Sequence, residues 1–305
     1  MKKEELLKPR YDVVFQALFQ GNQDNITESL ISDILGEKVK IIDIKTDSNL
    51  IKRYPTDKAG RLDLKTKFED ETICQIEMQM LDKHNTIKRI LYYWSRSYSE
   101  QLKRGDIYGE LKKTIGIIIT NYEIEEMKGI EEMKGIEEMK GIEELDTKWQ
   151  IIESKRGKRI LTEDLELRII EIPKAERILE KEIHNRIAQW LTFINNPNTE
   201  RVEKIMKENE EVKKAKSVLH VMSKDEELKR LAELKEKWER DEKSAQAAWK
   251  EEGLEEGIEK GRREGRREEK VSIAKNMKKN KFTTEQIAQI TGLSKEEIEE
   301  IQENN

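Results

Sequence analysis

The segment GRLDLKTKFEDETICQIEMQ, residues 60 to 79, constrains the fold most, because it predicts two antiparallel strands around a tight acidic turn. A three-residue turn over residues 69–71 pairs residues whose numbers sum to 140, so Asp63 lies opposite Glu77. The residues predicted to face the core are Leu62, Leu64, Cys74, Ile76 and Met78. The opposite, polar face carries Asp63, Lys65, Lys67, Gln75, Glu77 and Gln79.

The polar face of this hairpin has two interpretations. Asp63 and Glu77 directly opposite each other repel, and a divalent cation between them reverses that cost. The other interpretation is a half-solvated sheet, on which alternating Lys, Glu and Gln are ordinary. The hairpin alone does not decide between a metal site and a solvated face.

The flanking segments predict a mixed α/β fold. The predicted helices cover residues 10–20, 26–36 and 84–104, with Gly36 and Gly105 as stops. The predicted strands, besides the hairpin, cover 39–47, the apolar run TIGIIIT at 114–120, and stretches near 147–154 and 165–173. We therefore expect a central sheet flanked by helices.

Composition favours one core with an extension. The chain has 305 residues, 40% of them charged and 35% hydrophobic, and it becomes almost continuously helical beyond Pro173. No apolar run reaches the roughly 18 residues that a membrane span needs, and the N-terminus lacks the apolar stretch of a signal peptide. We therefore expect a cytoplasmic location and no membrane partner.

The cysteine and histidine content excludes two kinds of site. Cys74 is the single cysteine, and the histidines are His84, His184 and His220, so neither a disulfide framework nor a zinc cage can form. Any metal must be held by oxygen. The formal net charge of -5 gives no whole-chain attraction to phosphates, so nucleic-acid binding requires a local basic surface.

The hexapeptide EEMKGI occurs three times in succession from Glu125 to Ile142. A six-residue period matches neither 3.6 nor 7, so its apolar positions drift around a helix and form no stripe. The repeat favours a duplication tolerated in a surface loop over an evolved binding arm.

The C-terminal third contains three further features. Glycines recur every fourth position at 253, 257, 261 and 265, which indicates a segment that is frayed or in close contact with another helix. The tail predicts two short helices, capped at Thr283 or Thr284 and at Ser294. This pair resembles a helix-turn-helix, but the glutamates of its second helix favour packing or dimerisation. Residues 260–270 form a strongly basic short run, which either lies along a DNA backbone or, as its glutamates favour, is a solvated charged helix.

The motifs between residues 8 and 195 resemble the PD-(D/E)XK nuclease superfamily, and within it the recombination-promoting nucleases known as nuclease-family transposases. The matching elements are D-x-x-F at 12–15, LF at 18–19, LD at 62–63, EMQ at 77–79, and a helix with Arg89, Tyr92, Tyr93, Gln101, Leu102, Gly105 and Tyr108. The EMQ strand together with the tyrosine helix is the specific part. The glycine-spaced tail is also similar to the usual C-terminus of this family.

The resemblance implies a restriction-endonuclease-like core that hydrolyses DNA phosphodiester bonds with magnesium, or with manganese or calcium. In that scheme Asp63 and Glu77 bind the cation, and Gln79 stands where most of the superfamily has lysine. Glutamine orients a water but supplies no positive charge, so slow or conditional cleavage is expected. Gln16 likewise stands where family members commonly have lysine.

Four further residues are candidates for the same site. Asp12 is either an additional acidic neighbour of the metal or an ordinary first-turn helix residue. Arg89, with Lys65 and Lys67 nearby, is a candidate phosphate contact, and Tyr93 lies one helical turn beyond Arg89. Because Tyr92, Tyr93 and Trp94 are consecutive, at least one of these three is core.

The preferred hypothesis is a magnesium-dependent DNA endonuclease linked to recombination or mobile elements, forming a homodimer through its C-terminal helices. The alternative is a nuclease-derived DNA-binding or protein-interaction module without turnover; a purely structural coiled coil over 200–280 is weaker. The predicted domains are 1–195, a nuclease-like domain carrying the repeat; 196–280, a charged helical extension; and 281–305, a two-helix element.

Overall fold

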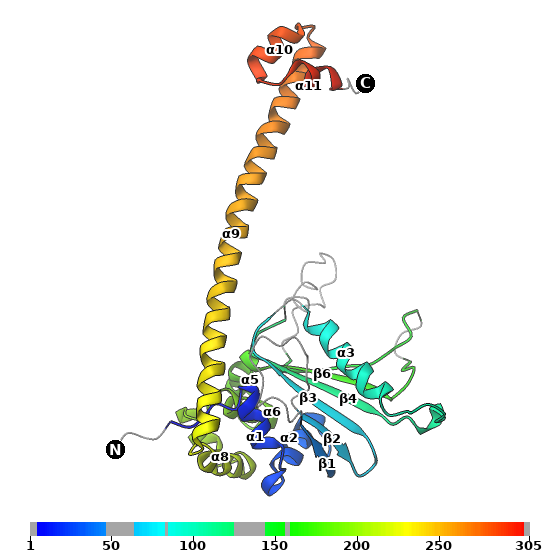
Figure 1. The fold of residues 1–305 in the computed structure, drawn as a ribbon, viewed down its shortest axis with the longest axis vertical. Coiled ribbons are helices and arrows are strands. Elements are labelled where there is room, and N and C mark those ends of the chain that lie inside the picture. Colours follow the sequence, from blue (N-terminus) through cyan, green and yellow to red (C-terminus); the bar gives the residue numbers. More distant parts are fainter. Residues whose placement is uncertain (1–4, 47–63, 83–84, 125–143, 156–158, 302–305) are drawn as a thin grey trace. The chain divides into compact units, whose positions relative to one another are not determined.

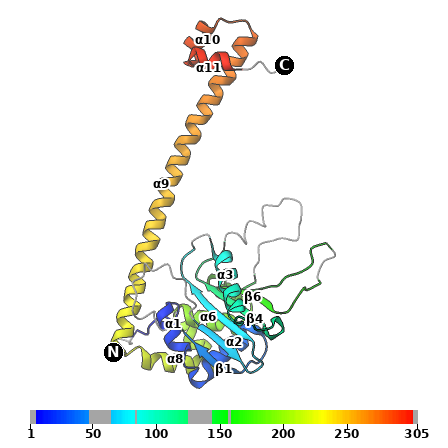
Figure 2. The same cartoon turned by 45° about the vertical axis from the view of Figure 1, so that its right-hand side comes forward.

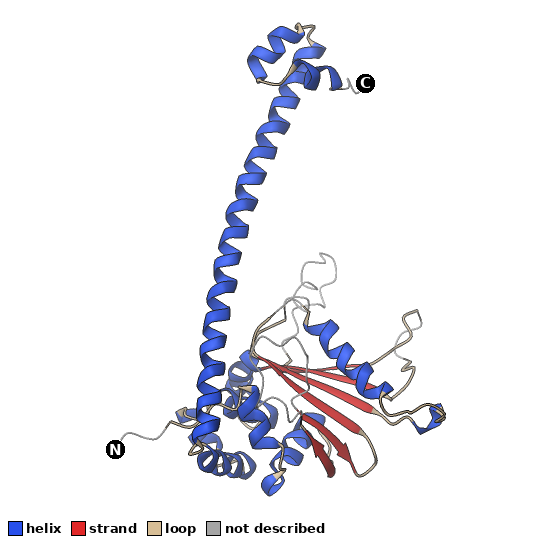
Figure 3. Cartoon of the chain, viewed as in Figure 1, coloured by secondary structure: helices blue, strands red, loops and turns tan. Residues whose placement is uncertain are grey.

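The computed structural model describes residues 5–46, 64–82, 85–124, 144–155 and 159–301. The helices are α1 Asp12–Phe19, α2 Ile26–Leu35, α3 Thr86–Ser99, α5 Ala175–Lys181, α6 Arg186–Asn195, α7 Glu200–Ile205, α8 Glu210–Met222, α9 Glu226–Lys279, α10 Thr284–Thr291 and α11 Lys295–Glu300. Three single 3-10 turns are η1 Gln23–Asn25, η3 Tyr108–Glu110 and η5 Ile172–Lys174. The strands are β1 Ile41–Lys45, β2 Leu64–Phe68, β3 Ile73–Gln79, β4 Thr114–Thr120, β5 Asp146–Trp149 and β6 Leu165–Glu171 (Figure 3).

The hairpin of β2 and β3 has the predicted register. Leu64 pairs with Ile76 and Thr66 with Cys74, in antiparallel order. The turn closes because Glu71 adopts a φ of 70° and the Asp70 carboxylate accepts from the backbone N–H of Thr72 at 3.0 Å. The described part of this ladder ends at the pair of Leu64 and Ile76. The predicted acidic pair, Asp63 and Glu77, would be the next one.

All six strands form one sheet in the order β1-β2-β3-β4-β6-β5. The pairs β3–β4 and β4–β6 are parallel, whereas β1–β2, β2–β3 and β5–β6 are antiparallel. The predicted mixed sheet with flanking helices and a long C-terminal helix is therefore confirmed. Parallel neighbours require crossover connections, and α3 provides the one between β3 and β4 (Figure 1).

One face of the sheet supports the main core. The predicted inward residues Leu64, Cys74, Ile76 and Met78 pack there against side chains of α1, α2, α6 and α8, while Leu62 lies outside the described residues. Trp190 of α6 is fully buried in this layer. The core continues through α7 and α8, beyond residue 195, where the sequence analysis places the end of the nuclease-like domain. That domain boundary stays a prediction.

Helix α3 covers the other face (Figure 2). Its Ile90 packs with Ile118 of β4 and with the buried leucines and isoleucine of β6. Gly116 allows this close approach: a Cβ there lies 3.0 Å from Cδ2 of Leu167 and 3.6 Å from Cγ1 of Ile90. The polar residues of β3 on this face are therefore under a helix.

The chain forms two compact units, residues 1–240 and 241–305. In the second unit the end of α9 packs with α10 and α11 around Ala274, Ile287, Leu293 and Ile298. Capping boxes at Thr283 and Ser294 begin the two short helices, as predicted, and Gly292, with a φ of 68°, ends α10.

Helix α9 is continuous through the four regularly spaced glycines, and the choice between fraying and contact with another helix stays a prediction. Among the described residues, an added Cβ at each of these glycines meets no atom within 4 Å beyond its own neighbours in the helix. Among the described residues, no helix is both long and apolar enough to cross a membrane.

Candidate active site

Three polar side chains of β3 share the face beneath α3. Gln75, Glu77 and Gln79 are 2%, 4% and 6% exposed. The half-solvated interpretation is therefore wrong for β3, because α3 covers these three side chains, whereas Lys65 and Lys67 of β2 on the same face are partly exposed. Ser97 Oγ of α3 lies 2.6 Å from the side-chain amide of Gln75, which ties the helix to the strand.

Glu77 is the ionisable group at the centre of this face. The Arg89 guanidinium of α3 donates to Oε1 of Glu77 through Nε, and its terminal nitrogen pairs with the same oxygen. Oε2 is buried and has no hydrogen-bond partner among the described residues. Burial raises the pKa of the Glu77 carboxyl to about 7, even though Arg89 acts to lower it.

Gln79, two residues along the same strand, has a second unsatisfied oxygen. Its Oε1 is buried without a hydrogen-bond partner in the described part of the chain. Alternation along a strand puts Glu77 and Gln79 on one face. Two buried oxygen acceptors without donors match the preference of a hard divalent cation for oxygen ligands, so these residues fit such a metal.

The second predicted metal ligand, Asp63, lies outside the described residues, and so its pairing with Glu77 remains a prediction. Within the described residues no group of three or more His, Cys, Asp or Glu side chains is placed to hold a metal ion. The described part of the site therefore contributes one carboxylate and one amide oxygen.

Arg89 and Tyr93 form one unit on α3. The guanidinium carbon of Arg89 lies 5.5 Å from the centre of the Tyr93 ring, a cation–π distance. Tyr93 is buried, Tyr92 is exposed, and Trp94 donates to the carbonyl of Thr114 at 2.7 Å. The three aromatic residues thus face different directions, as their spacing predicts.

Lys65 and Lys67 lie on β2 beside a hollow of about 160 Å³. Lys65 pairs with Gln75 and with Lys45 across the sheet. Burial lowers the pKa of Lys65, and the charge of Lys45 lowers it further, while Glu100 acts in the opposite direction. Lys67 forms an exposed ion pair with Glu71 at 3.2 Å.

Asp12 begins α1 and has a cationic partner. Its Oδ2 lies 2.6 Å from Nζ of Lys235 in α9, and its Oδ1 accepts from the backbone N–H of Val13. These contacts stabilise the start of the helix. A metal-binding role of Asp12 remains a prediction.

Thr86 and Tyr122 also lie at this site, and the sequence analysis predicted neither of them as a site residue. Their hydroxyl oxygens are 2.6 Å apart. Burial raises the pKa of Tyr122, and the charges of Asp82, Arg89 and Glu77 also act on this hydroxyl. The available sequence signal was the position of Tyr122 just beyond the carboxyl end of a parallel strand, where ligand sites gather in open α/β sheets.

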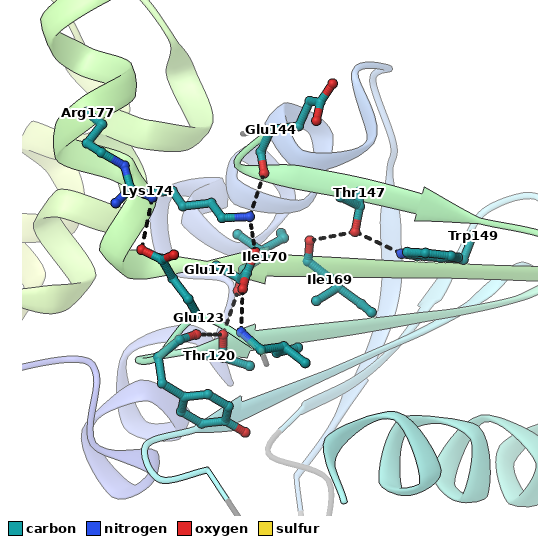
Figure 4. A network of polar contacts seen from close by, with 12 residues as sticks. Thr120, Glu123, Glu144, Thr147, Trp149, Ile169, Ile170, Glu171, Lys174 and Arg177 are labelled. Carbon is teal, nitrogen blue, oxygen red and sulfur yellow. Dashed lines mark hydrogen bonds and ion pairs between the residues drawn. The ribbon is translucent and has the colours of Figure 1, made fainter. Parts of the chain in front are cut away.

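A buried ion pair lies at the carboxyl ends of β4 and β6 (Figure 4). Glu171 pairs with Lys174 of η5, and both side chains are almost fully buried. Glu171 Oε1 accepts from the backbone N–H of Ile124 at 2.7 Å, and Lys174 donates to the carbonyl of Glu144 at 3.3 Å. The two ends of the repeat-bearing segment are thus attached to one ion pair.

A second ionic cluster lies on the opposite face of the sheet from α3. Glu166 Oε2 is 3.0 Å from Lys113 and 3.2 Å from Lys148, and Oε1 accepts from Arg168 at 2.9 Å. Arg168 also contacts Asp146 at 2.6 Å. Although burial opposes ionisation, hydrogen bonds from Lys113 and Arg168 lower the pKa of Glu166 to about 2.

Comparison with known proteins gives two matches to families. A family described as "PD-(D/E)XK nuclease family transposase" matches residues 9–248. A second, "Rpn/YhgA-like nuclease family, C-terminal HTH domain", matches residues 267–303. No curated protein and no solved structure matches this chain.

The second match favours the helix-turn-helix alternative for the tail, whereas the sequence analysis preferred a packing or dimerisation element. It begins at Arg267, within α9, so the domain includes the end of that helix besides α10 and α11. The sequence interpretation considered the last two helices alone. It therefore assigned the recognition position to the glutamate-rich segment and treated the basic end of α9 separately, as a solvated helix or a contact along the DNA backbone.

Proposed function

Because the chain belongs to the family of PD-(D/E)XK nuclease family transposases, we propose that it is a metal-dependent DNA endonuclease acting in recombination or mobile-element chemistry. The observation that carries the proposal is the pair of buried, unsatisfied oxygens on Glu77 and Gln79. Both are acceptors, both lie on one strand face, and both fit a hard cation.

The proposed metal ligands are Glu77 and Asp63, with magnesium as the first candidate and manganese or calcium as alternatives. A bound divalent cation supplies a Lewis acid for the scissile phosphate and lowers the pKa of a bound water. The unpartnered amide oxygen of Gln79 would hold either the cation itself or a water beside it. Since Gln79 carries no charge, we expect slower cleavage than a lysine at this position supports.

Arg89 and Lys65 are the proposed phosphate contacts. Arg89 is held against the Tyr93 ring and lies directly beside Glu77, so a phosphate near that carboxylate is within reach of the guanidinium. Lys65 borders the hollow on the same side of the sheet. Asp12 is retained as a possible additional acidic residue.

The proposed partners are DNA and a second copy of the chain. The helix-turn-helix match supports DNA binding. The open glycine face of α9 supports self-association, because glycine lets two helices approach closely.

The test is magnesium-dependent nicking of supercoiled plasmid by wild type, Asp63→Ala and Glu77→Ala. We expect nicking by wild type and a loss of at least about 100-fold in both variants. DNA binding in chelator should be similar for all three proteins, which separates chemistry from folding. Equal nicking by wild type and both variants would refute the assignment.

A second candidate function is a DNA-binding or protein-interaction module without turnover. The contact between Arg89 and Glu77 favours it, because the carboxylate already has a cationic partner. Calorimetric titration with magnesium and manganese separates the two functions. Heat and a raised melting temperature support the enzyme, whereas neither change, together with retained DNA binding, supports the module.

A further inference from the structure

The helices of the second unit differ sharply in charge. Residues 260–281, the last part of α9 and the turn after it, contain ten Lys and Arg against three Asp and Glu. Residues 282–301, which include α10 and α11, contain one Lys against five Glu. The unit therefore presents a basic helix packed with an acidic helix pair (Figure 1).

Four of the cations lie on one face of α9. Arg262, Arg266 and Lys270 follow one another at intervals of four residues, and Arg263 lies three residues before Arg266. All four side chains are exposed. These four residues are called the basic stripe below.

The glutamates of the same segment do not cancel the charge of the basic stripe. Glu264 and Glu268 lie between its successive members, two residues from each, which is about 200° around an α-helix. These two carboxylates therefore face away from it. Glu259 and Glu269 lie at its borders, so four cations stand against two carboxylates on this side of the helix.

The basic stripe also has no counter-ion of its own. Arg267 pairs with Glu297 of α11 at 3.0 Å, and Lys260 is 4.0 Å from Glu264. By contrast, no ion pair between residues that the structure describes includes a member of the basic stripe. A row of exposed cations without counter-ions attracts phosphates, which the net charge of the whole chain does not.

Helix α11 has the opposite character. Glu296, Glu299 and Glu300 are exposed on it. In a helix-turn-helix the second helix ordinarily enters the major groove, where these carboxylates would repel the phosphates on both sides. The matched helix-turn-helix domain of this chain is therefore unsuited to bind DNA through its second helix.

We propose that the basic stripe is the DNA-binding face of the C-terminal domain, and that α11 directs its glutamates away from the duplex. The proposal rests on the proposed function only in taking DNA as the partner. The major groove admits a continuous α-helix, and basic helices of this kind cross it in other DNA-binding proteins. The stripe contacts phosphates, so it positions the domain on DNA without reading sequence.

The end of the basic stripe lies beside the turn of the matched domain. Nζ of Lys270 is 3.4 Å from the position of a Cβ added to Gly292, the residue that ends α10. A duplex on the stripe thus reaches this turn.

The test measures the affinity of the full chain for a short fluorescent DNA duplex in chelator, over a range of potassium chloride concentrations. The stripe variant is Arg262→Ala with Arg266→Ala. The matched control, Lys275→Ala with Lys279→Ala, removes two exposed cations of the same helix from its other side. Both variants change the net charge equally, and their melting temperatures should agree with that of the wild type.

The stripe variant should bind DNA more weakly than the wild type. Its slope of log affinity against log salt concentration should flatten by about 0.9 for each phosphate contact removed, about 1.8 in all. The control should keep a slope close to that of the wild type. An unchanged slope in the stripe variant, or equal flattening in the control, would overturn the proposal, because binding would then follow net charge alone.

A third variant tests the acidic helix. Glu299→Gln with Glu300→Gln should leave DNA affinity close to that of the wild type, since these side chains face away from the duplex. A gain in affinity of about tenfold or more would place α11 against the phosphates and overturn the proposal.

A second copy of the chain is the other occupant that the charges allow, because its acidic α11 complements the basic stripe. Sedimentation without DNA separates the two occupants. Loss of self-association in the stripe variant, with wild-type DNA affinity, would assign the stripe to the second copy and reject DNA as its occupant.

These outcomes are distinguishable from failure of the enzyme. A wild type that never nicks DNA, but whose affinity depends on Arg262 and Arg266, retains the stripe and rejects the nuclease. A wild type that nicks, while the stripe variant binds with the wild-type slope, retains the nuclease and rejects the stripe.

Discussion

Two nitrogens of Arg89 contact a single oxygen of Glu77 and leave the other carboxylate oxygen buried without a partner among the described residues. The ion pair therefore supplies hydrogen-bond donors to only one of the two carboxylate oxygens of Glu77. Glu77 is 4% exposed, so loss of its cationic partner has a cost in stability as well as in function.

Arg89→Ala should lower the free energy of unfolding by about 3 kcal/mol, because it leaves a buried carboxylate without its cation. Urea unfolding at pH 9 measures the change, because Glu77, with a pKa of about 7, is ionised there in the wild type. Arg96→Ala is the matched control on the same helix. It breaks an exposed pair with Glu100, so it should lower the free energy of unfolding far less than Arg89→Ala does. Equal costs for the two variants would contradict this interpretation of the Glu77 environment.

Gln79→Lys should raise the rate of magnesium-dependent nicking by about tenfold or more, since the ammonium adds the positive charge that the amide lacks. Gln79→Met, which neither orients water nor carries charge, should nick more slowly than wild type. Single-turnover plasmid assays compare the three proteins. A decrease in both variants would show that the amide itself is required.

Gly116→Val should destabilise the first unit by about 2 kcal/mol, because the new side chain meets Leu167 and Ile90 beneath α3. Thermal unfolding checks this prediction. Gly109→Val introduces the same side chain where no other atom lies within 4 Å of an added Cβ, so its cost should be smaller. If both substitutions cost the same, α3 does not lie close to β4 at this point.

Glu166 should contribute to acid stability. Its pKa in the folded protein, about 2, is below the ordinary 4.5, so its contribution is present above pH 4.5 and is lost as pH falls towards 2. The largest contribution of Glu166 to the free energy of unfolding is about 3 kcal/mol. Glu166→Gln should remove this pH dependence, as measured by urea unfolding at pH 7 and pH 3. Glu71→Gln, which removes a carboxylate from an exposed cluster, should leave the pH dependence of unfolding close to that of the wild type.

Gly261→Leu should weaken self-association by at least about tenfold if two copies of α9 pack through the glycine face. Analytical ultracentrifugation of the full chain measures the effect. Glu259→Leu places the same side chain on a different face of the helix and should leave association unchanged. A wild type that sediments as a monomer would reject the dimer.

The hairpin shows how far local sequence rules reach. Its strands, its turn and its register follow from alternation and from turn residues, and Leu64 and Ile76 are paired as predicted. Local rules did not reveal that Glu77 is buried. That burial depends on α3 folding back over the sheet, which requires the missing side chain of Gly116.

The C-terminal domain shows a different limit. In the tail, the helix that completes the last domain belongs to the long α9, and no sequence signal separates the end of that helix from the rest.

The ion pair of Glu171 and Lys174 has a consequence for the gene as well as for the protein. It binds the chain at Ile124 and again at Glu144, on either side of the three hexapeptide copies. Loop closure depends only weakly on loop length, so replication slippage that adds or removes one copy leaves both attachments intact. Natural variants of this protein should therefore differ in copy number and share an unaltered sheet.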